Sequence, residues 1–302
     1  MNKQNLLLTI ANKSKLIVES TFKGYDLCLN PYVGCQFGCK YCYVRFFIKD
    51  KKAEWGDFVR RREHIITKLP GELAKIDSGS RLVLGTMTDP YQPEERKHRL
   101  TRSALTSILQ MSKPFDKVGI FTRSPIVIDD INLISRLPKA RVHFSVTPFT
   151  QNVMAKIELI PIHTKARWNT IRKLKEAGIR VHVNVAPAIP IVSDPLITEY
   201  CETMANIGVD EFFVDPMQTY SESYDALKGS MIDDSNWSAI DHIMTDKVRF
   251  KLWKDQYRDA WISEWKKVGD PSKTLAIWCD HVHKVWIDMI TGKNLNPRNY
   301  GT

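Results

Sequence analysis

The 302-residue sequence predicts an α/β fold in which six β/α units follow one another along the chain. Short apolar runs rich in β-branched residues alternate with longer polar stretches of helical spacing. The apolar density of these runs is typical of strands that are buried on both faces of a parallel sheet. Six β/α units in series indicate a barrel-like or doubly wound α/β fold. The candidate strands are residues 25–32, 81–86, 117–122, 141–146, 179–187 and 210–216.

Two of the segments between these strands have clear helical patterns. In residues 164–178, apolar side chains recur on one helix face and Thr164 is a suitable N-cap. Gly178 stands where a helix commonly ends in a left-handed residue. Residues 101–112 have the same spacing of apolar side chains. Both segments therefore predict helices that pack on the sheet.

The pattern changes after residue 217, where tryptophan becomes frequent. Residues 244–269 predict an amphipathic helix, and residues 274–292 predict a strand or hairpin. We therefore divide the chain into a main domain, residues 1–217, and a C-terminal extension, residues 218–302, which packs on that domain. The tryptophans of the extension are Trp237, Trp253, Trp261, Trp265, Trp278 and Trp286.

Composition narrows the class of protein. Hydrophobic residues make up 43% of the chain and charged residues 26%, as in globular proteins with a sizeable core. No run of 18 apolar residues is present, so we expect no membrane-spanning helix and no membrane partner. The first residues lack the long apolar stretch and the cleavage site of a signal peptide. We therefore expect a cytoplasmic protein in which thiols stay reduced. We also expect it to be a monomer.

The formal net charge is +10, and three segments concentrate the basic residues: 45–64, 95–102 and 164–180. Excess positive charge favours polyanionic partners such as nucleic acids. The alternative is a solvated basic surface without a specific partner, and charge alone leaves both interpretations open.

Half of the six cysteines, Cys35, Cys39 and Cys42, fall within eight residues of one glycine-bearing stretch. A structural zinc site commonly takes four ligands from two cysteine or histidine pairs, and no second CxxC pair is present. A disulfide would leave one odd thiol in a reducing compartment. Three thiolates suit a cubane iron–sulfur cluster, which normally takes four cysteines, and would leave one iron open. An ordinary glycine loop with incidental cysteines is the remaining alternative.

The pattern CxxxCxxC followed by an aromatic residue, in a loop after the first predicted strand, resembles the radical S-adenosylmethionine (SAM) superfamily. In that family the three cysteines hold a 4Fe–4S cluster, and the amino and carboxylate groups of SAM bind the fourth iron. Reduction cleaves SAM to a 5′-deoxyadenosyl radical, which abstracts hydrogen from the substrate. The resemblance implies a partial (β/α)6 TIM-like barrel and a reductant such as flavodoxin or ferredoxin. We expect the extension, residues 218–302, to cover the opening of that barrel. Gly34 and Gly38 would let the loop wrap closely around a cluster.

Across residues 28–217 the chain also resembles the spore photoproduct lyase-like branch, which includes "DNA repair photolyase-like" proteins. The segments that carry this resemblance end predicted strands, where the loops of α/β barrels form the site. The matching positions imply contacts with SAM: Thr88 and Asp89 near the methionine amino group, Arg123 on the carboxylate, Ser145 on the ribose, and Tyr43 and Asn184 near the adenine. Arg167 matches a family arginine to which we assign no role. Simpler alternatives are a turn for Asp89, a helix-surface charge for Arg167 and packing over the cluster for Tyr43.

One departure concerns the hydrogen donor. Spore photoproduct lyases use a cysteine near the segment that matches GTMTDP, and here that position is Thr86, beside Met87. Repair of the thymine photoproduct is therefore not expected. Tyr41 also matches a tyrosine that flanks the last cluster cysteine in those enzymes, so the resemblance makes it a candidate catalytic residue.

The C-terminal extension contains a second thiol of interest. If residues 277–286 form a strand, Cys279, His281 and His283 share one face, which is suited either to a metal or to a hydrogen donor at Cys279. The alternative is a polar strand face that covers the barrel mouth. Cys28 and Cys201 are expected to be core residues.

Three functions follow from these patterns. The first is a radical SAM enzyme that acts on a nucleic acid or nucleotide. The second is a radical SAM enzyme that acts on a peptide or small metabolite, and the third is a non-catalytic metal-binding regulatory protein.

Overall fold

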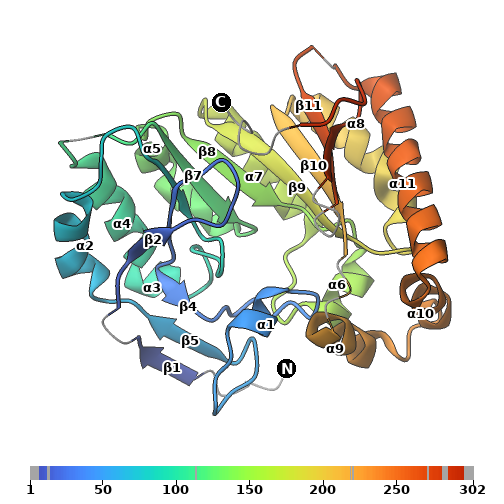
Figure 1. The fold of residues 1–302 in the computed structure, drawn as a ribbon, viewed down its shortest axis with the longest axis horizontal. Coiled ribbons are helices and arrows are strands. Elements are labelled where there is room, and N and C mark those ends of the chain that lie inside the picture. The colour runs from blue at the N-terminus through green and yellow to red at the C-terminus, as the bar shows by residue number, and fades with distance from the viewer. Residues whose placement is uncertain are drawn as a thin grey trace.

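The computed structural model describes residues 7–11, 14–112, 114–217, 219, 221–270, 272–280 and 285–295. Within these residues the main sheet has nine strands in the order β12-β11-β10-β9-β8-β7-β6-β3-β2 (Figure 1). Seven neighbouring strands, from β3 to β11, pair in parallel, while β2 and β12 add antiparallel edges. The strands are β2 (Ile17–Glu19), β3 (Leu27–Leu29), β6 (Arg81–Leu84), β7 (Lys117–Thr122), β8 (Arg141–Ser145), β9 (Arg180–Ala188), β10 (Glu211–Pro216), β11 (Leu275–Asp280) and β12 (Val285–Asp288).

All six strands expected from the sequence are present and parallel, which confirms a mixed α/β fold built on a parallel sheet. The two expected helices are also present, as α4 (Leu100–Leu109) and α7 (Thr164–Glu176). Gly178 has a φ of +73°, as its position predicted, but the N-cap of α7 is His163 and not Thr164.

Helices flank the sheet along its length. In Figure 1, α2 and α4 lie beside one end of the sheet, and α8 and α11 lie beside the other. The remaining helical elements are α1 (Val44–Phe47), α2 (Ile65–Leu73), α3 (Glu95–His98), η1 (Pro125–Asp130), α5 (Ile131–Ile134), α6 (Gln151–Ile157), η2 (Asp194–Leu196), α8 (Ile197–Ile207), α9 (Ser221–Met231), α10 (Trp237–Thr245) and α11 (Lys247–Val268). No helix in the described ranges is long and apolar enough to cross a membrane.

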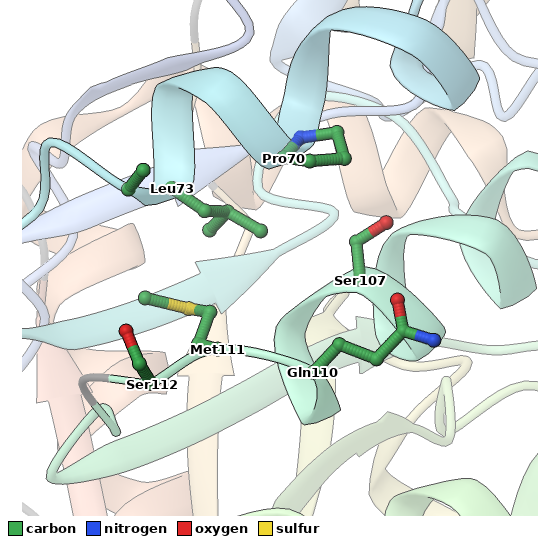
Figure 2. A pocket seen from close by; sticks show the side chains of 7 residues that line it. Pro70, Leu73, Ser107, Gln110, Met111 and Ser112 are labelled. Atoms are coloured by element: carbon green, nitrogen blue, oxygen red, sulfur yellow. The ribbon is translucent and has the colours of Figure 1, made fainter.

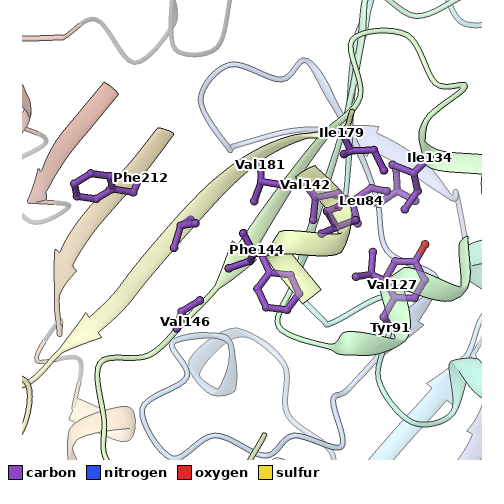
Figure 3. Packing of buried hydrophobic residues seen from close by; sticks show 14 of the residues in the cluster. Leu84, Tyr91, Val127, Ile134, Val142, Phe144, Val146, Ile179, Val181 and Phe212 are labelled. Atoms are coloured by element: carbon purple, nitrogen blue, oxygen red, sulfur yellow. The ribbon is translucent and has the colours of Figure 1, made fainter. Parts of the chain in front are cut away.

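The main core lies between the sheet and these helices. Leu84 on β6, Val142 and Phe144 on β8, and Val181 on β9 are fully buried there (Figure 3). Because successive side chains of a strand point to opposite faces, the residues between them lie on the other face of the sheet.

That other face carries aromatic rings and charged side chains beside its aliphatic residues. The rings of Phe121, His143, His182 and Phe213, from four adjacent strands, lie 4.2 to 5.0 Å apart between centroids. The hydroxyl of Tyr25, which precedes β3, lies 2.8 Å from Nε2 of His143 on β8. In the sheet order β6 and β7 separate β3 from β8, so the contact between Tyr25 and His143 spans two intervening strands on this face.

The residues after 217 continue the main sheet. β11 pairs in parallel with β10, and β12 pairs with β11 in an antiparallel hairpin, as the sequence predicted for this region. The predicted amphipathic helix is α11, and its buried tryptophans pack into the main core. α9 and α10 form a second apolar cluster with α6. The division at residue 217 stays a prediction.

A small three-stranded sheet lies at the edge of the molecule where α1 is found (Figure 1). It contains β1 (Leu7–Ile10), β5 (Phe58–Arg61) and β4 (Tyr32–Val33). β4 leads directly into the stretch with the three clustered cysteines, so this sheet fixes where that stretch begins.

Candidate active site at the cysteine loop

The cysteine loop, residues 34–43, turns through two glycines that no other residue could replace without strain. Gly34 and Gly38 have φ values of +84° and +53°. A Cβ on Gly38 would lie 2.3 Å from Cδ1 of Leu159, and one on Gly34 would lie 2.4 Å from the carbonyl oxygen of Phe58. The loop therefore needs glycine for both its backbone conformation and its close packing.

The three cysteines of this loop are free thiols that face donors from the backbone. Cys35 and Cys39 are buried and Cys42 is half-buried. Burial raises the pKa of all three thiols. Amides of Phe37 and Asp89 hydrogen-bond Cys35, as the amides of Val44 and Arg45 do for Cys42. Amide donors of this kind stabilise thiolates and metal-bound sulfurs.

The arrangement of the cysteines distinguishes among a disulfide, a zinc site and an iron–sulfur cluster for this loop. None of the six cysteines forms a disulfide. Among the described residues, no three His, Cys, Asp or Glu side chains form a group that could hold one metal ion. In a cubane each thiolate binds a different iron, so its cysteines need not meet at one point. The donor set and the glycine turns therefore fit a cluster better than a mononuclear zinc site.

Arg123 joins the cysteine loop to the carboxyl end of β7. Its Nη1 donates to Sγ of Cys39 at 2.7 Å and to Oε1 of Glu158 at 2.9 Å. Its Nη2 donates to the hydroxyl of Tyr41 at 2.7 Å, and this hydroxyl donates in turn to Glu158. The family resemblance predicted that Arg123 contacts the SAM carboxylate. In the structure its guanidinium contacts Cys39 and Tyr41 of the cysteine loop.

Glu158 is the residue that the sequence reasoning missed. It follows α6, is 3% exposed, and also accepts a hydrogen bond from Nη2 of Arg167 at 2.9 Å. Burial alone would raise the pKa of Glu158, but Arg123 and Arg167 lower it overall. The only signal in the sequence is one acidic residue within an apolar stretch. Arg167 is fully buried, so the alternative of a helix-surface charge is wrong.

Thr88 and Asp89 follow β6, and Thr88 is buried while Asp89 is half-buried. The Asp89 carboxylate accepts hydrogen bonds from the Thr122 hydroxyl (2.7 Å) and from the amides of Arg123 (2.9 Å) and Tyr91 (2.8 Å). The hydroxyl of Thr88 donates to the carbonyl of Tyr32 at 3.0 Å. Asp89 therefore ties the ends of β6 and β7 together beside the cysteine loop, and burial raises its pKa.

Tyr43 lies at the surface next to the end of β6. Its side chain is 47% exposed, and its hydroxyl donates to the carbonyl of Thr86 at 2.9 Å. The backbone amide of the neighbouring Met87 donates to Oδ1 of Asn30 at 3.0 Å. The segment that carries Thr86 thus lies against both the last residue of the cysteine loop and the residues that precede β4.

Three other predicted residues share the ring-lined face of the sheet. Ser145 and Asn184 are direct register partners on β8 and β9, and Arg123 follows Phe121 on that face. Oδ1 of Asn184 is buried and has no hydrogen-bond partner among the described residues. An unpaired buried acceptor is costly, so this amide is suited to a ligand that enters the face.

Cys279 lies on the same face, farther from the cysteine loop. Phe213 pairs with Asn184 and with Ile277, and Cys279 stands two residues beyond Ile277 on β11. It is 2% exposed. His281 and His283 lie outside the described residues, so the predicted metal face of three residues is not described. Cys28 and Cys201 are buried as expected.

The basic segment near the loop contains arginines with internal partners. Arg60 forms an ion pair with Asp50, and Nε of Arg61 lies 3.0 Å from Glu63. Nη1 of Arg62 donates to the carbonyl of Lys15 at 3.4 Å. These three arginines are therefore weaker candidates for phosphate contacts than the exposed lysines that follow α1.

A surface hollow of about 290 Å³ lies elsewhere, between α2 and α4 (Figure 2). Pro70, Leu73, Ser107, Gln110 and Met111 are among the residues that line it. None of its lining residues titrates near neutral pH or binds metal strongly. Its chemistry gives no reason to place a catalytic site there.

Comparisons with protein families and with curated proteins are consistent with a cluster site at the cysteine loop. A model of the radical SAM superfamily matches residues 29–204. A protein of Methanocaldococcus jannaschii is 27% identical over 75% of this chain and 88% of its own length. A protein of Acidianus two-tailed virus is 29% identical over 69% of this chain and 74% of its own. Both are described as uncharacterized.

Solved structures of spore photoproduct lyase share the fold. One, with bound AdoMet and dinucleoside spore photoproduct, has a TM-score of 0.58 and 13% identity over 75% of this chain. This chain covers 66% of that lyase, so the likeness shows the fold and not the lyase activity. The family model spans more than half of this chain and includes the whole cysteine loop. The chain therefore belongs to the radical SAM superfamily, whose members are enzymes that use an iron–sulfur cluster and SAM.

Proposed function

We propose that Cys35, Cys39 and Cys42 bind a 4Fe–4S cluster with which this enzyme cleaves SAM. The observation that carries the proposal is three thiols on one glycine-turned loop, two of them with backbone amides as donors. When bound, the cluster supplies the electron that cleaves SAM to a 5′-deoxyadenosyl radical. The remaining steps depend on how the protein binds SAM, excludes water and holds the substrate.

We also propose that SAM binds across the ring-lined face at the carboxyl ends of the strands. Its support is the buried Oδ1 of Asn184, which has no hydrogen-bond partner in the part of the chain that the structure describes. Asn184 and its register partner Ser145 would hold the adenine and ribose. Tyr43 would cover the adenine, and Thr88 with Asp89 would face the methionine amino group. Arg123 stays the candidate for the carboxylate, although its guanidinium is also held by Glu158. The parallel strands would curve around this ligand as a partial (β/α)6 barrel.

The C-terminal extension is proposed to cover the opening of that barrel. α9 and α10 pack with α6 on an apolar cluster that Tyr41 borders. A cover is needed because a primary carbon radical must be shielded from solvent and stray hydrogen donors. Tyr41, in the cysteine loop, and Cys279, on β11, are the candidate hydrogen donors to the product radical.

For the substrate we propose a nucleic acid or nucleotide. Two observations support this class: the net charge of +10, and the dinucleoside spore photoproduct bound by the structurally similar lyase. A peptide or small metabolite is the second candidate, favoured by the internal pairing of Arg60 and Arg61. Polyanion binding should weaken steeply with salt, since each phosphate contact releases counterions.

Oligonucleotide binding distinguishes these substrate classes. The affinity for a labelled single-stranded oligonucleotide should fall about tenfold or more between about 50 and 200 mM salt. The double variant Lys51→Gln/Lys52→Gln should lower the salt slope by about two, because both lysines are exposed next to α1. Lys68→Gln/Lys75→Gln, exposed on and beyond α2, is the matched control and should leave the slope unchanged. Binding that ignores salt would favour a peptide or small metabolite.

A further inference from the structure

We propose that Glu158 is a positioning residue that fixes the Arg123 guanidinium against Cys39 and toward the SAM-binding face. The inference deepens the proposed function and rests on it, because it assigns the cluster and SAM to this loop. It concerns a residue with no role in the sequence patterns considered above.

Four side chains converge on the Glu158 carboxylate. Nη1 of Arg123 and Nη2 of Arg167 each donate to it at 2.9 Å. The Tyr41 hydroxyl donates to Oε1, and the Thr147 hydroxyl lies 3.5 Å from the same oxygen. A carboxylate held by this many donors has one orientation, and it transmits that orientation to Arg123.

The backbone on both sides of Glu158 is fixed to the cysteine loop. The amide of Lys40 donates to the carbonyl of Ile157 at 2.8 Å, and the amide of Leu159 donates to the carbonyl of Phe37 at 3.0 Å. The side chain of Leu159 also fills the space against Gly38. Glu158 therefore moves with the loop and cannot swing away from it independently.

The charges of this group do not balance internally. Two arginines face one carboxylate, which leaves a net charge of +1 from 2 − 1, and all three side chains are at least nine-tenths buried. Burying an unpaired charge is strongly unfavourable, so negative charge is favoured next to Arg123, where the Asp89 carboxylate already accepts from the Arg123 amide at 2.9 Å. Cys39 lies there at 2.7 Å, and a thiolate or the SAM carboxylate would supply the charge.

This arrangement predicts two properties of the loaded protein. A guanidinium that donates to a cluster thiolate stabilises the reduced, more negative cluster and raises its reduction potential. The same guanidinium, held in one orientation, gives a preformed partner for the carboxylate of SAM. Loss of the Glu158 contact should therefore lower the potential and weaken SAM binding together.

Two substitutions test whether Glu158 acts through the position of its carboxylate or through its charge. Glu158→Asp keeps the charge but is one methylene too short to reach both arginines. Glu158→Gln keeps the length but turns an amide donor toward a guanidinium donor. Both variants would let Arg123 leave Cys39. Both should lower the reduction potential of the anaerobically reconstituted cluster, and both should weaken SAM about tenfold, a typical effect of a residue behind a ligand.

The matched control is Glu211→Gln. Glu211 is equally buried and also pairs with two arginines, Arg141 and Arg180, but lies at the other end of the ring-lined face. It should change neither the potential nor SAM affinity. Arg123→Lys supplies a second test that leaves the Glu158 charge paired, and it should reproduce the lower potential because lysine cannot donate to Cys39 and Glu158 in the same geometry.

The potential is measured by an EPR-monitored redox titration and SAM affinity by calorimetry, on proteins with equal iron content. If Glu158→Asp matches the wild type while Glu158→Gln raises the potential, Glu158 acts by charge alone and the inference is wrong. Unchanged potential and SAM affinity in both variants also overturn it. A wild-type protein that holds no cluster or binds no SAM contradicts the proposed function instead, so the two failures are distinguishable.

Discussion

Two buried carboxylates in this protein each bind two arginines, yet they serve different parts of the fold. Glu211 accepts from Arg141 at 2.9 Å and Arg180 at 2.5 Å, and it contacts His182 at 3.1 Å. Those partners lie on β9, the neighbour of β10 in the main sheet, and on β8, the next strand along. Glu158 accepts instead from residues of β7's end, α7 and the cysteine loop.

The difference teaches which ion pairs hold the fold and which hold the site. The Glu211 group joins strands that are already paired through their backbones, so its loss should weaken the sheet without moving a loop. The Glu158 group joins segments that share no strand pairing, and it contacts a cysteine of the proposed cluster through Arg123. We therefore expect substitutions of Glu211 to lower the stability of the fold and substitutions of Glu158 to weaken cofactor binding.

The largest effect is expected from Cys39→Ala. Removal of one of three thiolates should abolish both bound iron and SAM cleavage, because no other cysteine is near enough in the chain to replace it. Iron content after anaerobic reconstitution and 5′-deoxyadenosine formation are the measurements. The matched variant Cys201→Ala, in α8, should retain both, and equal loss in the two variants would break the comparison.

Next in size is the effect of Glu211→Ala on stability. It leaves two arginines without their buried counter-charge, which costs about 3 to 5 kcal/mol of unfolding free energy. Urea unfolding of the apoprotein measures this change. Iron content should stay at the wild-type level when the folded protein is reconstituted, and a selective loss of iron would show that the two ends of the face are coupled.

Acid should weaken the Glu211 end by a comparable amount. Burial would raise the pKa of Glu211, but His182 and the two arginines lower it from 4.5 to about 2. Since the folded pKa lies below the unfolded one, the stabilisation is complete above pH 4.5 and is lost as the pH falls toward 2. The contribution is about 3 kcal/mol. The fall in unfolding free energy between about pH 5.5 and pH 3 should be smaller in Glu211→Gln, and an unchanged fall would contradict this account.

A smaller effect on stability should distinguish alanine substitutions at two glycines with positive φ, Gly38 and Gly178. At Gly38 a methyl group would meet Leu159 at 2.3 Å, whereas at Gly178, after α7, nothing lies within 4 Å of the added Cβ. Both changes carry the strain of a positive φ, about 1 kcal/mol. Gly38→Ala should cost about 2 kcal/mol more than Gly178→Ala because of the overlap. It should also lower iron content, which Gly178→Ala should not.

Much of the sheet was predictable because its signals are local. Each of the six predicted strands is a short apolar run, and the register of β7, β8 and β9 follows from packing both faces. The cysteine loop was predictable for the same reason, since its spacing and its glycines lie within ten residues. The end of α7 could be predicted from a single residue, Gly178, which has a positive φ.

The Glu158 group was not predictable, because its members are far apart in the chain and each has an ordinary local context. Arg167 has the spacing of an exposed helix residue, and only the fold buries it against Glu158. Likewise, nothing local indicates that the Asp89 carboxylate joins two strands through Thr122. Side-chain networks between loops depend on the completed sheet, whereas strand and turn signals do not.

The central claim is that this cysteine loop holds a 4Fe–4S cluster to which SAM binds directly. EPR spectroscopy of the reconstituted and reduced protein, with and without SAM, tests it most directly. The account predicts about four irons per chain and the signal of a reduced 4Fe–4S cluster, with g values that shift when SAM is added. Zinc in place of iron, a different cluster type, or a 4Fe–4S signal that SAM leaves unchanged would contradict it.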